Sequence, residues 1–242
     1  MLDDAEISRI LSFTAHPDDV DFAAAGTVAQ WTDAGIEVVY CVVTDGDAGG
    51  FDEDFPRSEV PALRRREQVD AAQVVGVSDV TFLGYPDGRL ETSIALRRDL
   101  SRVIRRVRPH RVVCPSPQRL WTRVFASHPD HLAAGEAALS AVYPDSRNPF
   151  AHPELAAEGL DAWTVDQVWL MAHDRANRYV DVTATLGRKV KALLCHASQM
   201  REPAAMEDRI RAWTAANAAE GGLPTGTLAE AFFAIDTAEG PG

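Results

Sequence analysis

The feature that most constrains the fold of this chain is a regular alternation of short apolar runs with longer amphipathic ones. Residues 38–44 (VVYCVVT) are β-branched and apolar, which is typical of a strand buried on both faces. Residues 93–107 repeat apolar side chains with a period close to 3.6, with arginines between them, which predicts an amphipathic helix. The predicted strands cover residues 10–15, 38–44, 80–83, 111–114, 165–171 and 231–235, and the predicted helices cover 21–34, 62–75, 93–107, 131–142 and 185–198.

Strand and helix alternate at least four times, which indicates right-handed βαβ units. We therefore predict an α/β fold, a single Rossmann-like domain over residues 1–242 with a mostly parallel sheet flanked by helices. Long connections are expected at residues 45–60, 84–92, 115–130 and 143–163. Three of these four follow a predicted strand, at the edge of the sheet where ligands bind in such folds.

Composition excludes several classes of partner. The chain has 24 basic and 36 acidic residues, for a net charge of −12, which argues against binding to nucleic acid or to an anionic membrane surface. It contains no apolar stretch of about 18 residues that could span a bilayer, and its acidic N-terminus does not resemble a signal peptide. The cysteines are three and widely spaced, so we expect no disulfide scaffold and a cytoplasmic location.

Two tetrapeptides carry three of the seven histidines. His16-Pro17-Asp18-Asp19 ends the first predicted strand, and His128-Pro129-Asp130-His131 opens a later helix. Proline and aspartate at a helix start are ordinary capping chemistry, and this explanation covers each motif taken alone. It does not explain why both motifs carry histidines with a second potential ligand three residues away, the spacing that brings side chains together over one turn.

The chemical interpretation is a divalent metal site of a hydrolase. His16, Asp19 and His131 would supply two imidazoles and a carboxylate, which is a donor set typical of catalytic zinc and also accepts iron(II) or another divalent ion. Asp18 cannot easily share the metal with its neighbour, so it is free to act as general base. His128 would act as general acid or hold a developing oxyanion.

Asp130 would orient one of these histidines through the second ring nitrogen.

Two alternative functions stay open from the residues alone. A non-haem iron oxygenase uses the same type of ligand set, although usually with an H-x-D/E spacing on a β-barrel. A binding or scaffold protein with a structural or degenerate metal site is the other alternative, and it would have a closed ligand shell.

The chain resembles the LmbE-like, or PIG-L, family of zinc-dependent de-N-acetylases, which act on GlcNAc conjugates. The resemblance extends over nearly the whole chain in the right order. The matching segments are AHPDDVDFAAAGTVAQW from Ala15, TDGDAGG from Thr44, the pair Arg64 and Glu67, LGYPDGRL from Leu83, SHPDHLAAGEAAL from Ser127, and DVTATLGRKVKALLCHASQ from Asp181.

The resemblance implies an LmbE-like deacetylase domain that acts on an amino-sugar conjugate or a natural-product intermediate, and it is compatible with a homo-oligomer. The acidic surface favours a soluble substrate over a phospholipid. The implied zinc ligands, base and acid are those already derived from the motifs. The resemblance adds substrate contacts at Arg64 and Asp87, with Asp47 near the metal.

Some positions depart from the family pattern or have plainer explanations. Val20 replaces a common glutamate, and Ala126 replaces a tyrosine that some members carry before the acid histidine, so we expect a changed acceptor pocket. The stretch 45–50 is interpreted as a flexible loop or a sugar cradle, and Asp87 also as a turn former. His196 is predicted to be a packed or hydrogen-bonded residue of the last strong helix.

Overall fold

The computed structural model describes residues 1–238, and within them seven strands form one sheet in the order β3-β2-β1-β4-β5-β7-β6. The strands from β1 to β5 run parallel, and β7 pairs antiparallel with both β5 and β6. The predicted α/β fold with a mostly parallel sheet is confirmed. The strands are β1 (Arg9–Thr14), β2 (Glu37–Thr44), β3 (Asp79–Tyr85), β4 (Arg111–Pro115), β5 (Gln167–Met171), β6 (Arg178–Asp181) and β7 (Ala229–Asp236).

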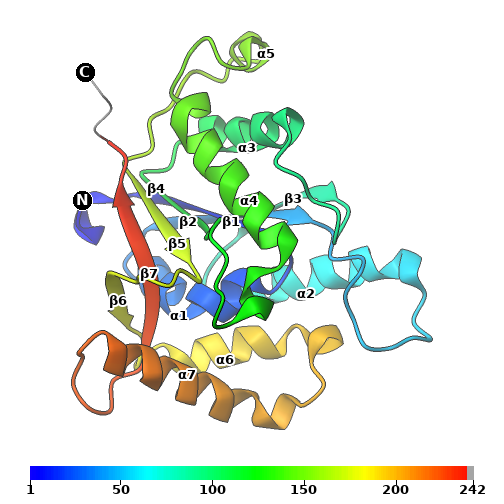
Figure 1. Cartoon of the computed structure of the whole chain (residues 1–242), viewed down its shortest axis with the longest axis vertical. Helices are drawn as coiled ribbons and strands as arrows, with labels where there is room; N and C mark the ends of the chain where they lie inside the picture. Colours follow the sequence, from blue (N-terminus) through cyan, green and yellow to red (C-terminus); the bar gives the residue numbers. More distant parts are fainter. Residues whose placement is uncertain (239–242) are drawn as a thin grey trace.

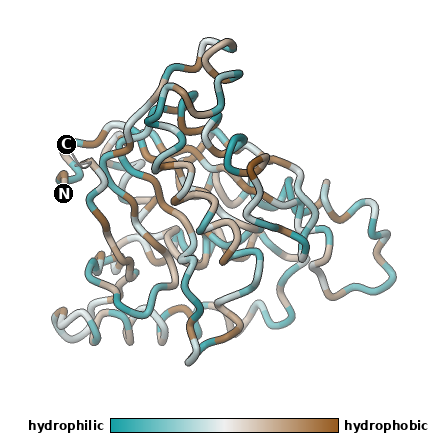
Figure 2. The backbone as a smooth tube through the Cα atoms, turned by 45° about the horizontal axis from the view of Figure 1, so that its top comes forward, coloured by the Kyte–Doolittle hydropathy of each residue, from teal (hydrophilic) through white to brown (hydrophobic). Residues whose placement is uncertain are grey.

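Helices cover both faces of the sheet (Figure 1). Successive residues of a strand point to opposite faces. Leu11 therefore joins the apolar cluster under α3 (Ile94–Val107) and α4 (Pro129–Ser140), and Ile10 joins the cluster under α1 (Asp19–Asp33) and α2 (Val60–Val74). In Figure 2 apolar, brown stretches of the backbone are gathered in the interior, and hydrophilic, teal stretches are frequent on the outside. The helices are α1 (Asp19–Asp33), α2 (Val60–Val74), α3 (Ile94–Val107), α4 (Pro129–Ser140), α5 (Pro153–Ala157), α6 (Leu186–Leu194) and α7 (Met206–Glu220).

The predictions of helices and strands fail mainly in the C-terminal half of the chain. The helix predicted over 185–198 ends at Leu194, because His196 has ψ +53° and leaves the helical path before a 3-10 turn at Ala197–Gln199. The strand β6 was not predicted, since it is short and only half-buried. Among residues 1–238, no helix is long and apolar enough to cross a membrane.

The order of the strands reverses direction near the middle of the sheet. The chain runs from β1 to β2 and β3 on one side and then continues with β4 on the other side of β1. The strand order therefore reverses at β1, and ligands of open α/β sheets bind at such a point, outside the carboxyl ends of the strands. Both His-Pro-Asp motifs follow strands that flank this point.

Candidate active site

The first His-Pro-Asp motif forms the turn between β1 and α1. The backbone N–H of His16 donates to Oδ2 of Asp19 at 2.8 Å, which closes the turn at the start of the helix. Asp18 has φ +93° and ψ −26°, a left-handed conformation that favours glycine. Non-glycine residues persist in this region only where the surrounding structure holds them, and such positions cluster at functional sites.

The second motif starts α4, and here a histidine caps the helix. The backbone N–H of Asp130 donates to Nδ1 of His128 at 3.2 Å. Nδ1 of His131 lies 3.2 Å from the carbonyl oxygen of Ala126, to which it donates. These bonds assign the neutral tautomers: His128 carries its proton on Nε2, and His131 has a free lone pair on Nε2. The capping explanation is thus correct for this motif, and it leaves the outer nitrogens available for chemistry.

The two motifs meet at the carboxyl edge of the sheet. Nε2 of His131 lies 2.9 Å from Oδ1 of Asp19 and 3.3 Å from Nδ1 of His16. Nδ1 of His16 lies 3.6 Å from Oδ2 of Asp19. One ligand atom from each of these residues lies within 4.8 Å of the others, so the three could hold a metal ion. Three protein ligands are the number that catalytic zinc sites use, with a fourth position for water.

A second group of potential ligands, His16, Asp87 and His128, shares one residue with the first. Nε2 of His16 lies 3.0 Å from Oδ1 of Asp87 and 3.3 Å from Oδ2 of Asp130, so it carries a proton that these carboxylates accept. In the neutral tautomer, Nδ1 then has the free lone pair, and it faces the first group. A histidine that binds a metal through one nitrogen and donates to a carboxylate through the other is a common arrangement, so this geometry suits the first group better.

Asp130 connects this histidine to the loop after β3. Its carboxylate is fully buried, and it accepts the backbone N–H of Gly88 at 2.7 Å and that of Leu90 at 3.2 Å. The sequence predicted that Asp130 contacts one of the site histidines, and the structure brings it to His16. A carboxylate fixed by two backbone donors can hold the imidazole ring in one orientation.

The residues that the resemblance placed around the substrate also lie here. Oδ1 of Asp47 accepts the backbone N–H of Asp87 at 2.8 Å, so the loops after β2 and β3 are joined. Oδ2 of Asp87 lies 3.9 Å from Nη1 of Arg64. The guanidinium of Arg64 is almost fully buried, and it donates to the carbonyl of Pro17 at 2.6 Å and to that of Gly46 at 3.1 Å.

The glycine-rich stretch after β2 packs on this arginine. Gly46 has φ +62°, and a Cβ there would lie 2.3 Å from Nη1 of Arg64. A Cβ on Gly49 would meet the same atom at 2.6 Å. The glycines therefore allow a close approach of the loop to a buried cation.

The electrostatics around His16 favour positive charge. Burial alone would lower the pKa of His16, but its hydrogen bonds with Asp130, Asp19 and Asp87 raise it to about 12. Burial also works against the charge of Asp19, yet His131 and His16 hold its pKa well below the usual range. A cluster of nitrogen and carboxylate donors with this preference fits a divalent cation.

The pKa values of Asp18 and His128 shift toward the neutral form, in contrast to those of His16 and Asp19. Burial raises the pKa of Asp18 to about 6, although Arg64, whose Nη2 lies 3.2 Å from Oδ2, opposes the shift. Burial lowers the pKa of His128, and the nearby His16 lowers it further. A carboxyl with a pKa near 6 suits a general base that works close to neutral pH.

A buried chain of polar groups behind the first motif was not predicted from the sequence. The backbone N–H of Asp18 donates to Oε1 of Gln68 at 2.8 Å, and Nε2 of Gln68 donates to Oδ2 of Asp21 at 2.9 Å. Nε2 of His196 lies 2.9 Å from the same oxygen. His196 is hydrogen-bonded as predicted, but it lies beyond the end of α6. The spacing of Gln68 four residues after Arg64 was the available signal, since it places both on one helix face.

The loop before the second motif is lined with exposed aromatic residues. Trp121 and Phe125 are each 81% exposed, and the guanidiniums of Arg119 and Arg123 lie over their rings. Ala126 takes part in the site through its backbone, since its carbonyl accepts a hydrogen bond from the ring of His131.

Comparison with known proteins places the chain in a family. The family model described as "PIG-L: GlcNAc-PI de-N-acetylase" matches residues 11–142, more than half of the 242 residues and a range that includes both motifs. The chain belongs to the PIG-L family. The resemblance stated from the sequence is therefore confirmed. The buried His196 and the helices α6 and α7 lie outside the range that the PIG-L model matches.

Relatives with deacetylase names cover most of this PIG-L chain. Diacetylchitobiose deacetylase of Thermococcus kodakarensis is 32% identical over 197 residues, which are 81% of this chain and 72% of that protein. Probable N-acetyl-alpha-D-glucosaminyl L-malate deacetylase 2 of Bacillus cereus is 30% identical over 198 residues, 79% of this chain and 83% of that one. The solved structure of N,N'-diacetylchitobiose deacetylase from Pyrococcus horikoshii matches with a TM-score of 0.88 at 28% identity, over 96% of this chain and 85% of that chain.

Proposed function

We propose that this protein is a divalent-metal-dependent N-deacetylase that removes an acetyl or similar acyl group from an amino-sugar conjugate. The observation that carries the proposal is the convergence of His16, Asp19 and His131, with Asp18 and His128 beside them. The names of the relatives, which refer to diacetylchitobiose and to an N-acetylglucosaminyl malate, support an N-acetylated amino sugar as the substrate class.

The metal would be held by His16 and His131 through imidazole nitrogens and by Asp19 through its carboxylate. We propose zinc, because this donor set with an open position is typical of catalytic zinc, and metal analysis would distinguish it from iron(II). When bound, the cation supplies Lewis-acid chemistry that polarises the acyl carbonyl and lowers the pKa of a nearby water.

The remaining steps fall to two side chains. Asp18, with a pKa of about 6, accepts the proton of the attacking water. His128 keeps its proton on Nε2, since Nδ1 accepts the N–H of Asp130, and it donates a hydrogen bond from Nε2 to the developing oxyanion. The proton that Asp18 takes from the water passes to the departing amine nitrogen. Asp130 holds the ring of His16 so that Nδ1 faces the metal position.

The substrate would lie against the loops after β2 and β3. We propose that Asp87 and Asp47 shape this side, because the carboxylate of Asp47 fixes the backbone at Asp87. Arg64 has little exposed surface, and its bonds to Pro17 and Asp18 support an action on the base as well as any contact with substrate.

A panel of N-acetyl-amino-sugar conjugates, N,N'-diacetylchitobiose among them, tests the proposal. We expect release of acetate and free amine in equal amounts, and about one divalent metal ion per chain by elemental analysis. If the metal-loaded protein deacetylates no member of the panel, the proposed substrate class is refuted. Oxygen consumption with Fe(II) and a keto acid would instead support the oxygenase alternative, and we expect none.

A further inference from the structure

The left-handed backbone of Asp18 depends on the peptide group that precedes it. This peptide joins Pro17 and Asp18, and its orientation sets φ of Asp18. Its carbonyl accepts Nη2 of Arg64 at 2.6 Å, and its N–H donates to Oε1 of Gln68 at 2.8 Å. Arg64 and Gln68 lie four residues apart on α2 and so share a helix face. One helix therefore holds both ends of the peptide that aims the proposed base.

The side-chain amide of Gln68 has only one orientation in this environment. Its Nε2 donates to Oδ2 of Asp21, while Oε1 accepts from Asp18. A flipped amide would place its NH2 against the backbone donor and its oxygen against a carboxylate. Gln68, Asp21 and His196 are all fully buried, so water cannot replace a lost partner. His196 adds a second donor to Asp21 and fixes the carboxylate that fixes Gln68.

We infer that Gln68, locked by Asp21 and His196, is a positioning residue that holds Asp18 in its left-handed conformation beside the metal centre. The inference rests on the proposed role of Asp18 as general base. Gln68 touches neither His128 nor the side chains of the proposed metal ligands in any hydrogen bond of the described residues. Gln68 acts through the backbone of Asp18. The segment after α6 supports Gln68 through the hydrogen bond of His196 to Asp21.

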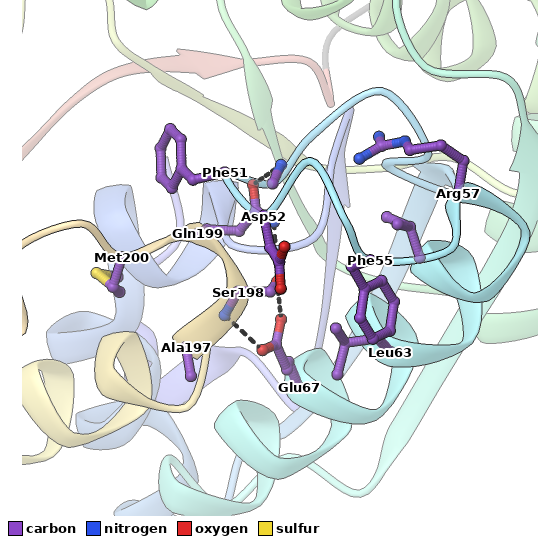
Figure 3. Close-up of a pocket in the computed structure, with 12 residues that line it drawn as sticks. Phe51, Asp52, Phe55, Arg57, Leu63, Glu67, Ala197, Ser198, Gln199 and Met200 are labelled. Carbon is purple, nitrogen blue, oxygen red and sulfur yellow. Dashed lines mark hydrogen bonds between the residues drawn. The ribbon is translucent and has the colours of Figure 1, made fainter.

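The same segment offers a matched control. Ser198 donates through its backbone N–H and its hydroxyl to the carboxylate of Glu67 at 2.8 and 2.7 Å, and Gln199 accepts the N–H of Gly50 (Figure 3). These bonds tie the segment to α2 and to the glycine loop, one residue away from Gln68, but they do not reach Asp18. Ser198→Ala should therefore affect packing of the same elements without affecting the base.

The first test is Gln68→Met, which keeps the volume and removes both hydrogen bonds. We expect kcat on N,N'-diacetylchitobiose to fall about 10- to 100-fold, with KM and bound metal unchanged, because a small misplacement of a reacting group has effects of this size. We also expect the Asp18 amide to exchange its hydrogen at least about tenfold faster. Ser198→Ala should lower thermal stability but keep kcat and the exchange rate at Asp18.

The second test exchanges the two partners. Gln68→Glu alone sets two carboxylates against each other, and we expect it to lower kcat. Gln68→Glu combined with Asp21→Asn restores one donor between them, with the Glu oxygen still accepting from Asp18. Without the charge of Asp21, His196 can be neutral with its single proton on Nδ1, which has no partner among the described residues, so that Nε2 accepts from the new amide. We expect the double variant to recover at least part of kcat and of the amide protection.

The inference is overturned if Gln68→Met keeps wild-type kcat and wild-type exchange at Asp18, or if the double variant is no better than Gln68→Glu. Should Gln68→Met fail to fold, the comparison of Gln68→Glu with the double variant Gln68→Glu/Asp21→Asn decides whether the inference holds. Hydrogen exchange needs no substrate, so loss of protection without any deacetylation by the wild type would refute the proposed function and retain the positioning role.

Discussion

The two His-Pro-Asp motifs begin α1 and α4, yet the same residue types take different tasks in them. In the first, the aspartate is Asp18, whose backbone is left-handed and whose side chain lies beside Arg64. In the second, the aspartate is Asp130, which binds the loop after β3, and His128 caps the helix with its own ring. The difference shows that neighbouring elements, rather than the motif, assign each residue its task.

Exposure separates the two aspartates further. The side chain of Asp18 is 16% exposed and that of Asp130 is 1% exposed. A general base must reach a water molecule, whereas a residue that orients a histidine must not exchange its partners for water. Their pKa values also move apart: burial raises that of Asp18 to about 6, while for Asp130 burial is outweighed by His16 and by two backbone donors, which lower it.

Removing the metal has the largest expected effect, and it tests whether the two motifs form one centre. We expect a chelator to lower deacetylase activity to background and zinc or iron(II) to restore it. Because the metal binds only the folded site, loading at about 1,000 times Kd should stabilise the fold by about 4 kcal/mol. At roughly 2–4 °C per kcal/mol for a chain of this size, Tm should rise by roughly 8–16 °C. If protein shown to be metal-free keeps full activity, the two motifs do not form a catalytic metal centre.

Asp18→Asn should have the next largest effect, because it keeps the shape of the side chain and removes the proposed base. We expect kcat to fall by about 10²–10⁴, the usual contribution of a positioned base, while the metal content stays the same. Asp45→Asn is a matched control: Asp45 pairs with the partly exposed Arg65 and has no hydrogen bond to the proposed site residues among the described contacts, so it should leave kcat unchanged. Wild-type turnover by Asp18→Asn on an accepted substrate would remove Asp18 from the mechanism.

The sequence predicts the parts of this molecule that depend on local pattern. The strand β2 is apolar on both faces and buried over seven of its eight residues, so its period alone identifies it. The metal group was predictable because each motif keeps its ligands within one turn, and the strand order brings both turns to one edge. The family resemblance added Arg64, Asp87 and Asp47, which share no local pattern with the motifs.

The remaining parts depend on partners far away in the sequence. Gln68 bonds to a backbone group 50 residues earlier, and His196 bonds to Asp21 across 175 residues. Apart from the position of Gln68 four residues after Arg64 on the same helix, nothing near these residues in the chain indicates such contacts. The end of α6 was misplaced for the same reason, because the helix stops where the segment after it turns toward Asp21 and Glu67. Long-range hydrogen bonds determine this boundary, and no local breaker marks it.

Asp130→Asn should have a smaller effect of a different kind from Asp18→Asn. The amide weakens the acceptor for Nε2 of His16, and loss of such a partner typically lowers metal affinity or activity about 10- to 100-fold. We expect weaker metal binding in a competition titration with a chromophoric chelator, and a kcat closer to wild type once metal is saturating. If instead kcat falls as far as in Asp18→Asn at full metal occupancy, the two aspartates do not have separate tasks.

The smallest expected effect concerns the network behind the first motif, for which the second motif has no counterpart in the described contacts. Burial lowers the pKa of His196, but its hydrogen bond and charge interaction with Asp21 outweigh this and raise it in the folded state. A raised folded pKa means that the stabilisation is complete below the unfolded value of about 6.5 and is lost as pH rises through the folded pKa.

His196→Gln keeps a donor for Asp21 and removes the titration. A charged hydrogen bond exceeds a neutral one by about 1 kcal/mol, so we expect a Tm lower than wild type by roughly 2–4 °C near pH 6. The difference should shrink as pH rises, because the wild type then loses the charge that the variant never had. Thr214→Val, which removes a buried hydroxyl on α7, should give a Tm difference independent of pH. A difference for His196→Gln that grows with pH would mean that His196 is neutral in the folded protein, and that Asp21 is fixed by hydrogen bonding alone.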